Sequence, residues 1–142
     1  MANVYKSNDV LIVDDDKEIC NVIEMYLENM GCFRNIIKAH DGSIAASKLT
    51  NQRFGLVLLD LNLPKRSGID VLKLFDKSAL NAVESVVIVS GEMGKEVMTT
   101  ALRQGVRFFL IKPFDETSFQ QKVIESLKET RKKAAEKAPK RR

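Results

Sequence analysis

Six polar side chains come directly after short apolar runs of the chain, at the point where each run ends. They are the acids Asp14, Asp15, Asp16 and Asp60, the hydroxyl of Ser90 and the ammonium group of Lys112. Each of them alone could be a turn former or a helix cap, and Asp16 fits best as the cap of the helix expected after it. These ordinary roles leave unexplained why such residues recur after four separate runs.

Together, these residue types predict a site that accepts a phosphoryl group. Clustered carboxylates repel one another and attract a hard cation, and a site with few protein oxygens and room for water favours Mg²⁺. An aspartate beside that ion can act as a nucleophile toward phosphorus and form an aspartyl phosphate. The metal ion and a lysine would neutralise phosphoryl oxygens, and a hydroxyl would hydrogen-bond another.

Five short apolar runs alternate with longer amphipathic stretches, a pattern that predicts five strand–helix units. The strands are expected at residues 10–13, 35–39, 56–59, 86–89 and 107–111. The helices are expected at residues 17–30, 41–50, 67–77 and 95–104, and a last helix is expected to open at residue 115. Strands this apolar must be covered on both faces, so we expect one α/β domain with a parallel sheet between helices. The carboxyl ends of its strands would share one edge, where such sheets bind ligands.

The last of these helices is expected to begin at the cap Asp115 and to bury one apolar face. The residues on that face are Phe119, Val123, Ile124 and Leu127.

Composition supports a single globular domain. The chain has 142 residues, of which 44% are hydrophobic and 30% charged, a balance typical of folded proteins. No apolar stretch approaches the roughly 20 residues of a membrane span, and the first residues lack the apolar core of a signal peptide, so we expect a cytoplasmic protein. Cys20 and Cys32 lack metal or disulfide spacing and are expected to be reduced packing residues. His40, the sole histidine of the sequence, is expected to be a loop residue.

The positive charge of the chain is concentrated at its end. The net charge is +4, but residues 128–142 hold eight Lys or Arg and two Glu, which leaves 15 basic and 17 acidic groups in the rest. We expect residues 129–142 to form a basic C-terminal tail that is frayed or disordered. Such a tail is usually solvated, so binding to nucleic acid or to another anionic surface is the less favoured alternative.

The chain resembles the receiver domain of two-component response regulators over about residues 9–128. The resemblance rests on four motifs in the order and spacing of that family: LIVDDD (11–16), LVLLDLNLPKRSG (56–68), VVIVSGE (86–92) and FFLIKPF (108–114). It implies a flavodoxin-like three-layer sandwich around a doubly wound five-stranded parallel sheet in the order 2-1-3-4-5. It also implies a signalling module that catalyses only its own phosphorylation and dephosphorylation. A histidine kinase or phosphotransfer protein would supply the phosphoryl group, and a downstream protein target or a homodimer would receive the signal.

The resemblance also assigns roles to individual residues. It makes Asp60 the phosphoacceptor, and it gives Mg²⁺ the ligands Asp14, Asp15, Asp60 and the backbone carbonyl of Asn62. Ser90 and Lys112 would bind the phosphoryl group, and the Lys112–Pro113 bond would be cis. Phe109 takes the place of a switch aromatic residue that is often tyrosine, and without a hydroxyl it can report only by packing.

The resemblance further implies a switch. On phosphorylation Ser90 would swing inward and Phe109 would turn from exposed to buried. That motion would change a partner face made by the fourth helix, the fifth strand and the fifth helix, with Met98, Leu102 and Lys122 as candidate contacts.

Two other functions fit the residues less well. A haloacid-dehalogenase-like phosphatase with Asp60 as nucleophile would need a second aspartate two residues later, where this chain has Asn62. A flavodoxin-like cofactor binder would need a phosphate loop after the first strand, where three aspartates would repel phosphate. Among receiver domains, the basic end of the chain favours a stand-alone module over the input domain of a longer regulator.

Overall fold

Alternation of side chains along each strand divides the core into two layers, one on each face of a central sheet. In the computed structural model, which describes residues 8–77 and 80–137, the strands are β1 (Asp9–Val13), β2 (Asn35–Ala39), β3 (Leu56–Leu59), β4 (Val86–Ser90) and β5 (Phe108–Ile111). All pair in parallel, in the order β2-β1-β3-β4-β5. The expected doubly wound topology is therefore confirmed.

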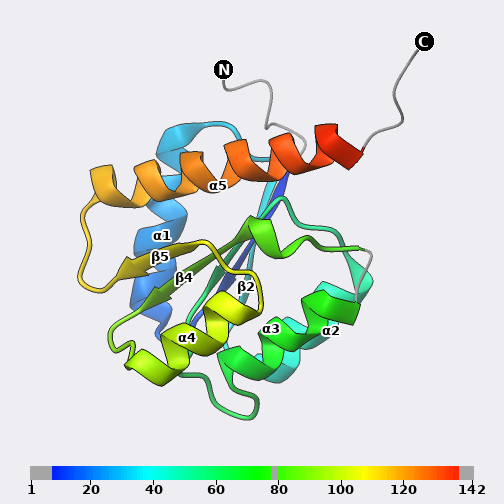
Figure 1. Ribbon diagram of the computed structural model, residues 1–142. Helices are drawn as coiled ribbons and strands as arrows, with labels where there is room; N and C mark the ends of the chain where they lie inside the picture. The colour runs from blue at the N-terminus through cyan, green and yellow to red at the C-terminus, as the bar shows by residue number, and fades with distance from the viewer. Residues whose placement is uncertain (1–7, 78–79, 138–142) are drawn as a thin grey trace.

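Helices cover both faces of the sheet (Figure 1). They are α1 (Lys17–Met30), α2 (Gly42–Asn51), α3 (Gly68–Lys77), α4 (Lys95–Arg103) and α5 (Glu116–Lys137), with a short 3₁₀ helix at Val83–Ser85. Along β1, Leu11 and Val13 belong to the apolar cluster that includes side chains of α2, α3 and α4, whereas Val10 and Ile12 belong to the cluster with α1 and α5. This period of two fixes the register, because a shift by one residue would exchange the two faces.

Capping side chains set the starts of three helices close to where the sequence predicts them. Asp16 accepts hydrogen bonds from the backbone N–H groups of the first turn of α1, and Asp41 and Asp115 do the same for α2 and α5. Gly31 ends α1 with a φ of 66°, a left-handed conformation that glycine adopts without steric cost. Both cysteines are buried and free, as expected.

The C-terminal helix differs most from the expectation. The boundary expected at residue 128 lies inside α5, which continues to Lys137, because residues 129–137 are rich in the helix formers Ala, Lys, Glu and Arg. Ile124 was expected in the buried face but is 37% exposed, since it lies about 100° around the helix from its buried neighbour Val123. Residues 138–142 lie outside the described residues. Among the described helices, none is long and apolar enough to cross a membrane.

Candidate functional site

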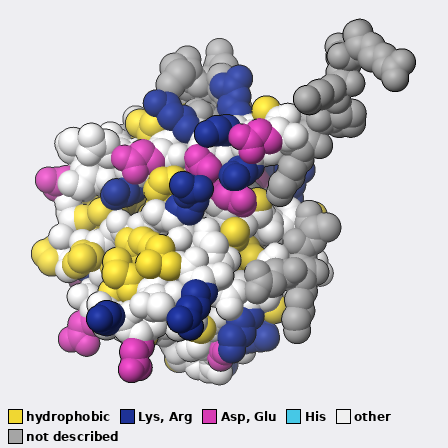
Figure 2. Space-filling view, viewed as in Figure 1, with side chains coloured by type: hydrophobic (Ala, Val, Ile, Leu, Met, Phe, Trp, Pro, Cys, Tyr) yellow, Lys and Arg dark blue, Asp and Glu magenta, His cyan; other side chains and the backbone are white. Residues whose placement is uncertain are grey.

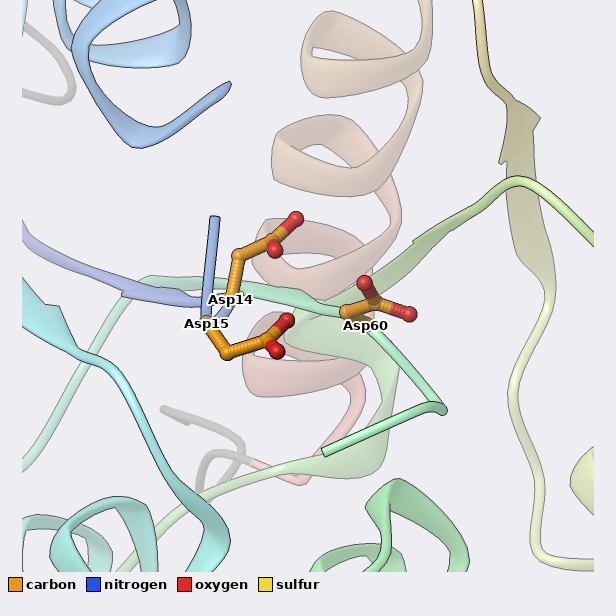
Figure 3. A group of neighbouring side chains, drawn as sticks. All are labelled: Asp14, Asp15 and Asp60. Atoms are coloured by element: carbon orange, nitrogen blue, oxygen red, sulfur yellow. The ribbon is translucent and has the colours of Figure 1, made fainter. Parts of the chain in front are cut away.

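The register of the sheet brings two acids side by side. Val13, the last residue of β1, pairs with Leu59, the last residue of β3, and Asp14 and Asp60 follow these residues directly. Asp15 adds a third carboxylate, and all three carboxylates lie at the edge where the two strands end (Figure 3). Their ligand oxygens lie within 4.8 Å of one another, with Asp14 and Asp60 buried and Asp15 exposed. The structure thus brings together the acids that the sequence singled out.

The ammonium group of Lys112 joins two of these acids. Its Nζ atom lies 2.7 Å from Asp14 Oδ2 and 2.9 Å from Asp60 Oδ2. The side chain reaches the site from the end of β5, and it is only 19% exposed. A lysine before a proline is usually exposed to solvent. The contacts with Asp14 and Asp60, which are far away in the sequence, hold Lys112 in the site instead. The Lys112–Pro113 bond is cis, as the resemblance implies.

The remaining oxygens of the two buried carboxylates accept hydrogen bonds from nearby groups. Asp14 Oδ1 accepts one from the backbone N–H of Asp16 at 2.9 Å. Asp60 Oδ1 accepts one from the backbone N–H of Asn62 at 3.0 Å and one from the Ser90 hydroxyl at 3.2 Å. Ser90 is fully buried at the end of β4, and its hydroxyl already points inward. The inward swing that we expected on phosphorylation is therefore not needed to bring Ser90 to Asp60.

Electrostatics at the site favour a divalent cation. Burial raises the pKa of Asp14, and its hydrogen bonds with Lys112 and the Asp16 N–H only partly oppose that rise. Burial alone would lower the pKa of Lys112, but its hydrogen bonds to Asp14 and Asp60 outweigh that effect and raise it. Three carboxylates and one ammonium group leave a formal charge of about −2, which a divalent ion would neutralise. The donor set is all oxygen and one carboxylate is open to water, which suits Mg²⁺.

Sequence reasoning missed two groups that hold the backbone of Asp14. His40 Nδ1 lies 3.0 Å from the Asp14 carbonyl oxygen, and Cys20 Sγ lies 3.4 Å from the same atom. His40 follows β2, the neighbour of β1 in the sheet. The expected strand order places β2 beside β1, so it could have revealed the contact between His40 and the backbone of Asp14.

Gly68 is a second feature that the sequence left as an ordinary turn residue. A Cβ atom on this residue would lie 2.5 Å from the backbone oxygen of Asp60 and from Leu61 Cα, and its N–H donates to the Leu61 carbonyl at 3.0 Å. Glycine therefore lets the start of α3 pack directly against the backbone that carries Asp60.

The residues expected at the partner face lie on α4, β5 and α5, away from the acids. Leu102 is 54% exposed, Met98 and Lys122 are half-buried, and Phe109 is half-buried against the cluster on the α2–α4 side. In Figure 2, hydrophobic side chains gather on the surface over β5 and α4. The expected motion of Phe109 from exposed to buried thus starts from a ring that is already partly packed.

Comparison with known proteins agrees with this geometry. The family model of the response regulator receiver domain matches residues 10–124. The chain belongs to this family. The transcriptional regulatory protein ZraR of Salmonella typhimurium is 32% identical over 128 residues, which are 90% of this chain and 28% of ZraR. This receiver domain thus spans less than a third of the length of that relative.

Solved structures show the same fold. A CheY-like response regulator receiver domain protein from Methanospirillum hungatei has 26% identity and a TM-score of 0.79, and the match covers 89% of this chain and 98% of that one. The CheX–CheY complex of Borrelia burgdorferi with BeF₃ and Mg²⁺ has 27% identity and a TM-score of 0.73, with 82% of this chain and 87% of the other covered. This chain is therefore a receiver domain of two-component response regulators, a signalling module, and the phosphatase alternative finds no support.

Proposed function

We propose that Asp60 accepts a phosphoryl group from the phosphohistidine of a histidine kinase or phosphotransfer protein. The observation that carries this assignment is the convergence of Ser90 Oγ and Lys112 Nζ on the Asp60 carboxylate, at 3.2 Å and 2.9 Å. These groups can bind the oxygens of an incoming phosphoryl group. Among the described residues, Asp14 accepts a hydrogen bond from Lys112 but none from a hydroxyl group, and Asp15 is exposed. Asp60 is therefore the best placed of the three acids.

In the proposed transfer, a carboxylate oxygen of Asp60 forms a bond to phosphorus while the P–N bond of the donor breaks. The electron pair of that bond leaves with the imidazole of the donor. Lys112 and Ser90 then bind phosphoryl oxygens, which replace part of their present contacts with the carboxylate. The phosphoryl group on Asp60 carries about −1.5 to −2 charges, in place of the −1 of the free carboxylate, and offers three acceptor oxygens.

Asp14, Asp15, Asp60 and the backbone carbonyl of Asn62 are the proposed ligands of Mg²⁺. When bound, the ion would offset the charge of the carboxylates and of the phosphoryl group. The formal charge of the site and its oxygen-only donor set support this proposal, as does the presence of Mg²⁺ in the CheX–CheY complex of Borrelia burgdorferi. The module is proposed to work in the cytoplasm and to catalyse only its own phosphorylation and dephosphorylation.

The proposed output is a change at the face made by α4, β5 and α5, which a downstream protein or a second copy of the chain would bind. Ser90 sits between the site and this face, since β4 pairs with β5. When the hydroxyl bonds a phosphoryl oxygen, Phe109 on the neighbouring strand can pack more deeply and alter the surroundings of Met98, Leu102 and Lys122. A bias of a few kcal/mol is enough to make a minor conformer dominant.

Labelling with a small acyl phosphate in the presence of Mg²⁺ tests the acceptor. The parent should gain one phosphoryl group, and Asp60→Asn should gain none, because an amide is a poor nucleophile and a weak metal ligand. The matched control is Asp41→Asn, which removes another acid at a strand end while keeping a side chain that can cap α2. Undiminished labelling of Asp60→Asn at a different residue would overturn the assignment.

The switch has a separate test. Ser90→Ala and Phe109→Ala should still be labelled at Asp60, but most of the change in self-association on adding beryllofluoride with Mg²⁺ should be lost. If both variants respond as fully as the parent, the signal leaves the site by another route.

A further inference from the structure

The C-terminal part of α5 forms an ordered basic surface. The last core side chain of the helix is Leu127, and the backbone then continues for ten more residues as helix (Figure 1). We call residues 128–137 the basic helix end. Its described side chains include four cations, Lys128, Arg131, Lys132 and Lys133, of which the first three are exposed. The helix holds these charges on a fixed framework, in contrast to the frayed tail that the sequence suggested.

The acids near this surface are already paired. Glu129 lies 3.4 Å from the guanidinium of Arg107, and Glu136 lies 3.8 Å from Lys133. Among the described residues, no carboxylate lies within ion-pair distance of Lys128, Arg131 or Lys132. These three cations therefore remain available to an external anion.

Two of the available cations border a hollow on the surface. The hollow has a volume of about 410 Å³ and is lined by Arg107, Phe108, Glu125, Lys128, Glu129 and Lys132. Its two acids are engaged, Glu129 with Arg107 and Glu125 with Lys122 at 3.6 Å. Lys128 and Lys132 are thus the cations in this hollow that have no carboxylate partner among the described residues.

The composition of this end of the chain favours a nucleic acid over a membrane surface as the partner. Residues 128–142 carry a net charge of +6 and contain no aromatic residue, Leu, Ile, Val or Met. A helix that lies in a membrane surface needs an apolar face to insert between lipids, and this segment offers none. The phosphate backbone of a nucleic acid requires only cations, whose binding releases condensed counterions.

The position of the basic helix end also suits a nucleic acid. α5 begins after β5, beside the edge that carries the acids, and runs back along the sheet, so that its last turns project at the other end (Figure 1). A bound polyanion would therefore lie away from the three clustered carboxylates and would not compete with phosphorylation.

We propose that the basic helix end binds nucleic acid through the phosphate backbone, without preference for base sequence. This binding goes beyond the proposed phosphoacceptor function and does not depend on it. With about three phosphate contacts, one for each available cation, the affinity should fall about 40-fold between about 50 and 200 mM salt.

The test is the fluorescence anisotropy of a labelled, mixed-sequence DNA duplex titrated with the full chain. The triple variant Lys128→Gln, Arg131→Gln, Lys132→Gln keeps good helix formers and should bind at least about 10-fold more weakly at low salt. The control triple variant Lys48→Gln, Arg53→Gln, Lys73→Gln removes the same net charge from the α2 and α3 side, and its affinity should change less than about 2-fold. Circular dichroism and thermal melting establish that both variants are folded.

Three results would overturn the proposal. One is no binding by the parent at low salt, which would mean that the helix end is only solvated. Another is equal weakening in both triple variants, which would mean that only total charge matters. The third is tighter association with phosphatidylserine vesicles than with DNA, which would indicate a membrane surface instead. Asp60→Asn should bind DNA like the parent, so failure of phosphorylation and failure of DNA binding can be told apart.

Discussion

Replacing Lys112 by methionine tests the charge balance of the site most directly. The ammonium group lies 2.7 Å from Asp14 Oδ2 and 2.9 Å from Asp60 Oδ2, and methionine keeps much of the length of the side chain without its charge. In Lys112→Met, two buried carboxylates would face the third, that of Asp15, without this compensating cation. We expect the variant to fold but to be less stable in the absence of metal.

The size of the effect follows from burial and distance. At an effective dielectric constant of about 20, unit charges 2.7 Å apart attract by roughly 6 kcal/mol, but desolvation of the ions cancels much of this. Loss of one partner from a buried ion pair costs about 3–5 kcal/mol, because the other charge stays buried without compensation. Lys112 is 19% exposed, so we expect a cost at the lower end of this range. The free energy of unfolding should fall by about 3 kcal/mol.

Mg²⁺ should reduce the difference in the free energy of unfolding between the parent and Lys112→Met. At 100 times its dissociation constant the ion stabilises a folded protein by about 2.7 kcal/mol, and it should bind the variant more tightly because no ammonium group competes for the carboxylate oxygens. If Mg²⁺ binds the variant about 30-fold more tightly than the parent, which adds about 2 kcal/mol, the difference between parent and variant should shrink to about 1 kcal/mol. The pKa of Lys112 is raised above 10.5 despite its burial, so its contribution is complete below pH 10.5 and is lost only as the pH rises through the raised value.

The assay is urea unfolding followed by far-UV circular dichroism, with EDTA and with saturating Mg²⁺. The control is Lys38→Met, which breaks the 2.9 Å ion pair with Glu24 on the surface of α1. It should lose less than about 1 kcal/mol, by the same amount with and without Mg²⁺. A gap for Lys112→Met that Mg²⁺ leaves unchanged would refute the idea that ammonium and metal ion balance the same carboxylates.

Three further predictions concern the metal site, the acid at the start of β1 and the glycine at the start of α3. Mg²⁺ should raise the melting temperature of the parent by a few degrees, and Asp15→Ala should lose most of this rise in a thermal scan; a full response in the variant would exclude Asp15 as a ligand. The bidentate hydrogen bond from Arg34 holds the pKa of Asp9 below its ordinary value of 3.8. Above pH 3.8, Asp9→Asn should therefore be less stable than the parent by about 1–3 kcal/mol. This difference should vanish as the pH falls through the lowered pKa, and urea unfolding across that pH range measures it. Gly68→Ala should cost about 1–3 kcal/mol through overpacking, whereas Gly91→Ala, with nothing within 4 Å of the added Cβ, should stay within about 0.5 kcal/mol.

Local patterns were enough to predict most of the elements. The runs of apolar residues and the spacing of helical faces give β2 and α1 with the bounds that the structure has, at residues 35–39 and 17–30. These signals are local because the periods of 2 and 3.6 residues come from backbone geometry. The caps Asp16, Asp41 and Asp115 are local for the same reason, since each bonds an N–H group two or three residues away.

Element ends depend more on context. The sequence predicts that the domain ends near residue 128 and that a frayed tail follows, yet α5 continues to Lys137. Helix propensity of Ala, Lys, Glu and Arg maintains the helix once a packed segment has formed, because nucleation, the costly step, is already complete.

The sequence by itself determined the residue types of the site and the edge of the sheet at which they gather, because parallel strands end on the same side. Only the tertiary structure decided how these side chains meet. Lys112 bonds Asp14 across 98 residues of chain, Ser90 bonds Asp60 across 30, and His40 contacts the backbone of Asp14 across 26. Such contacts depend on strand order, register and the reach of each side chain, quantities that are fixed only when separate elements pack together.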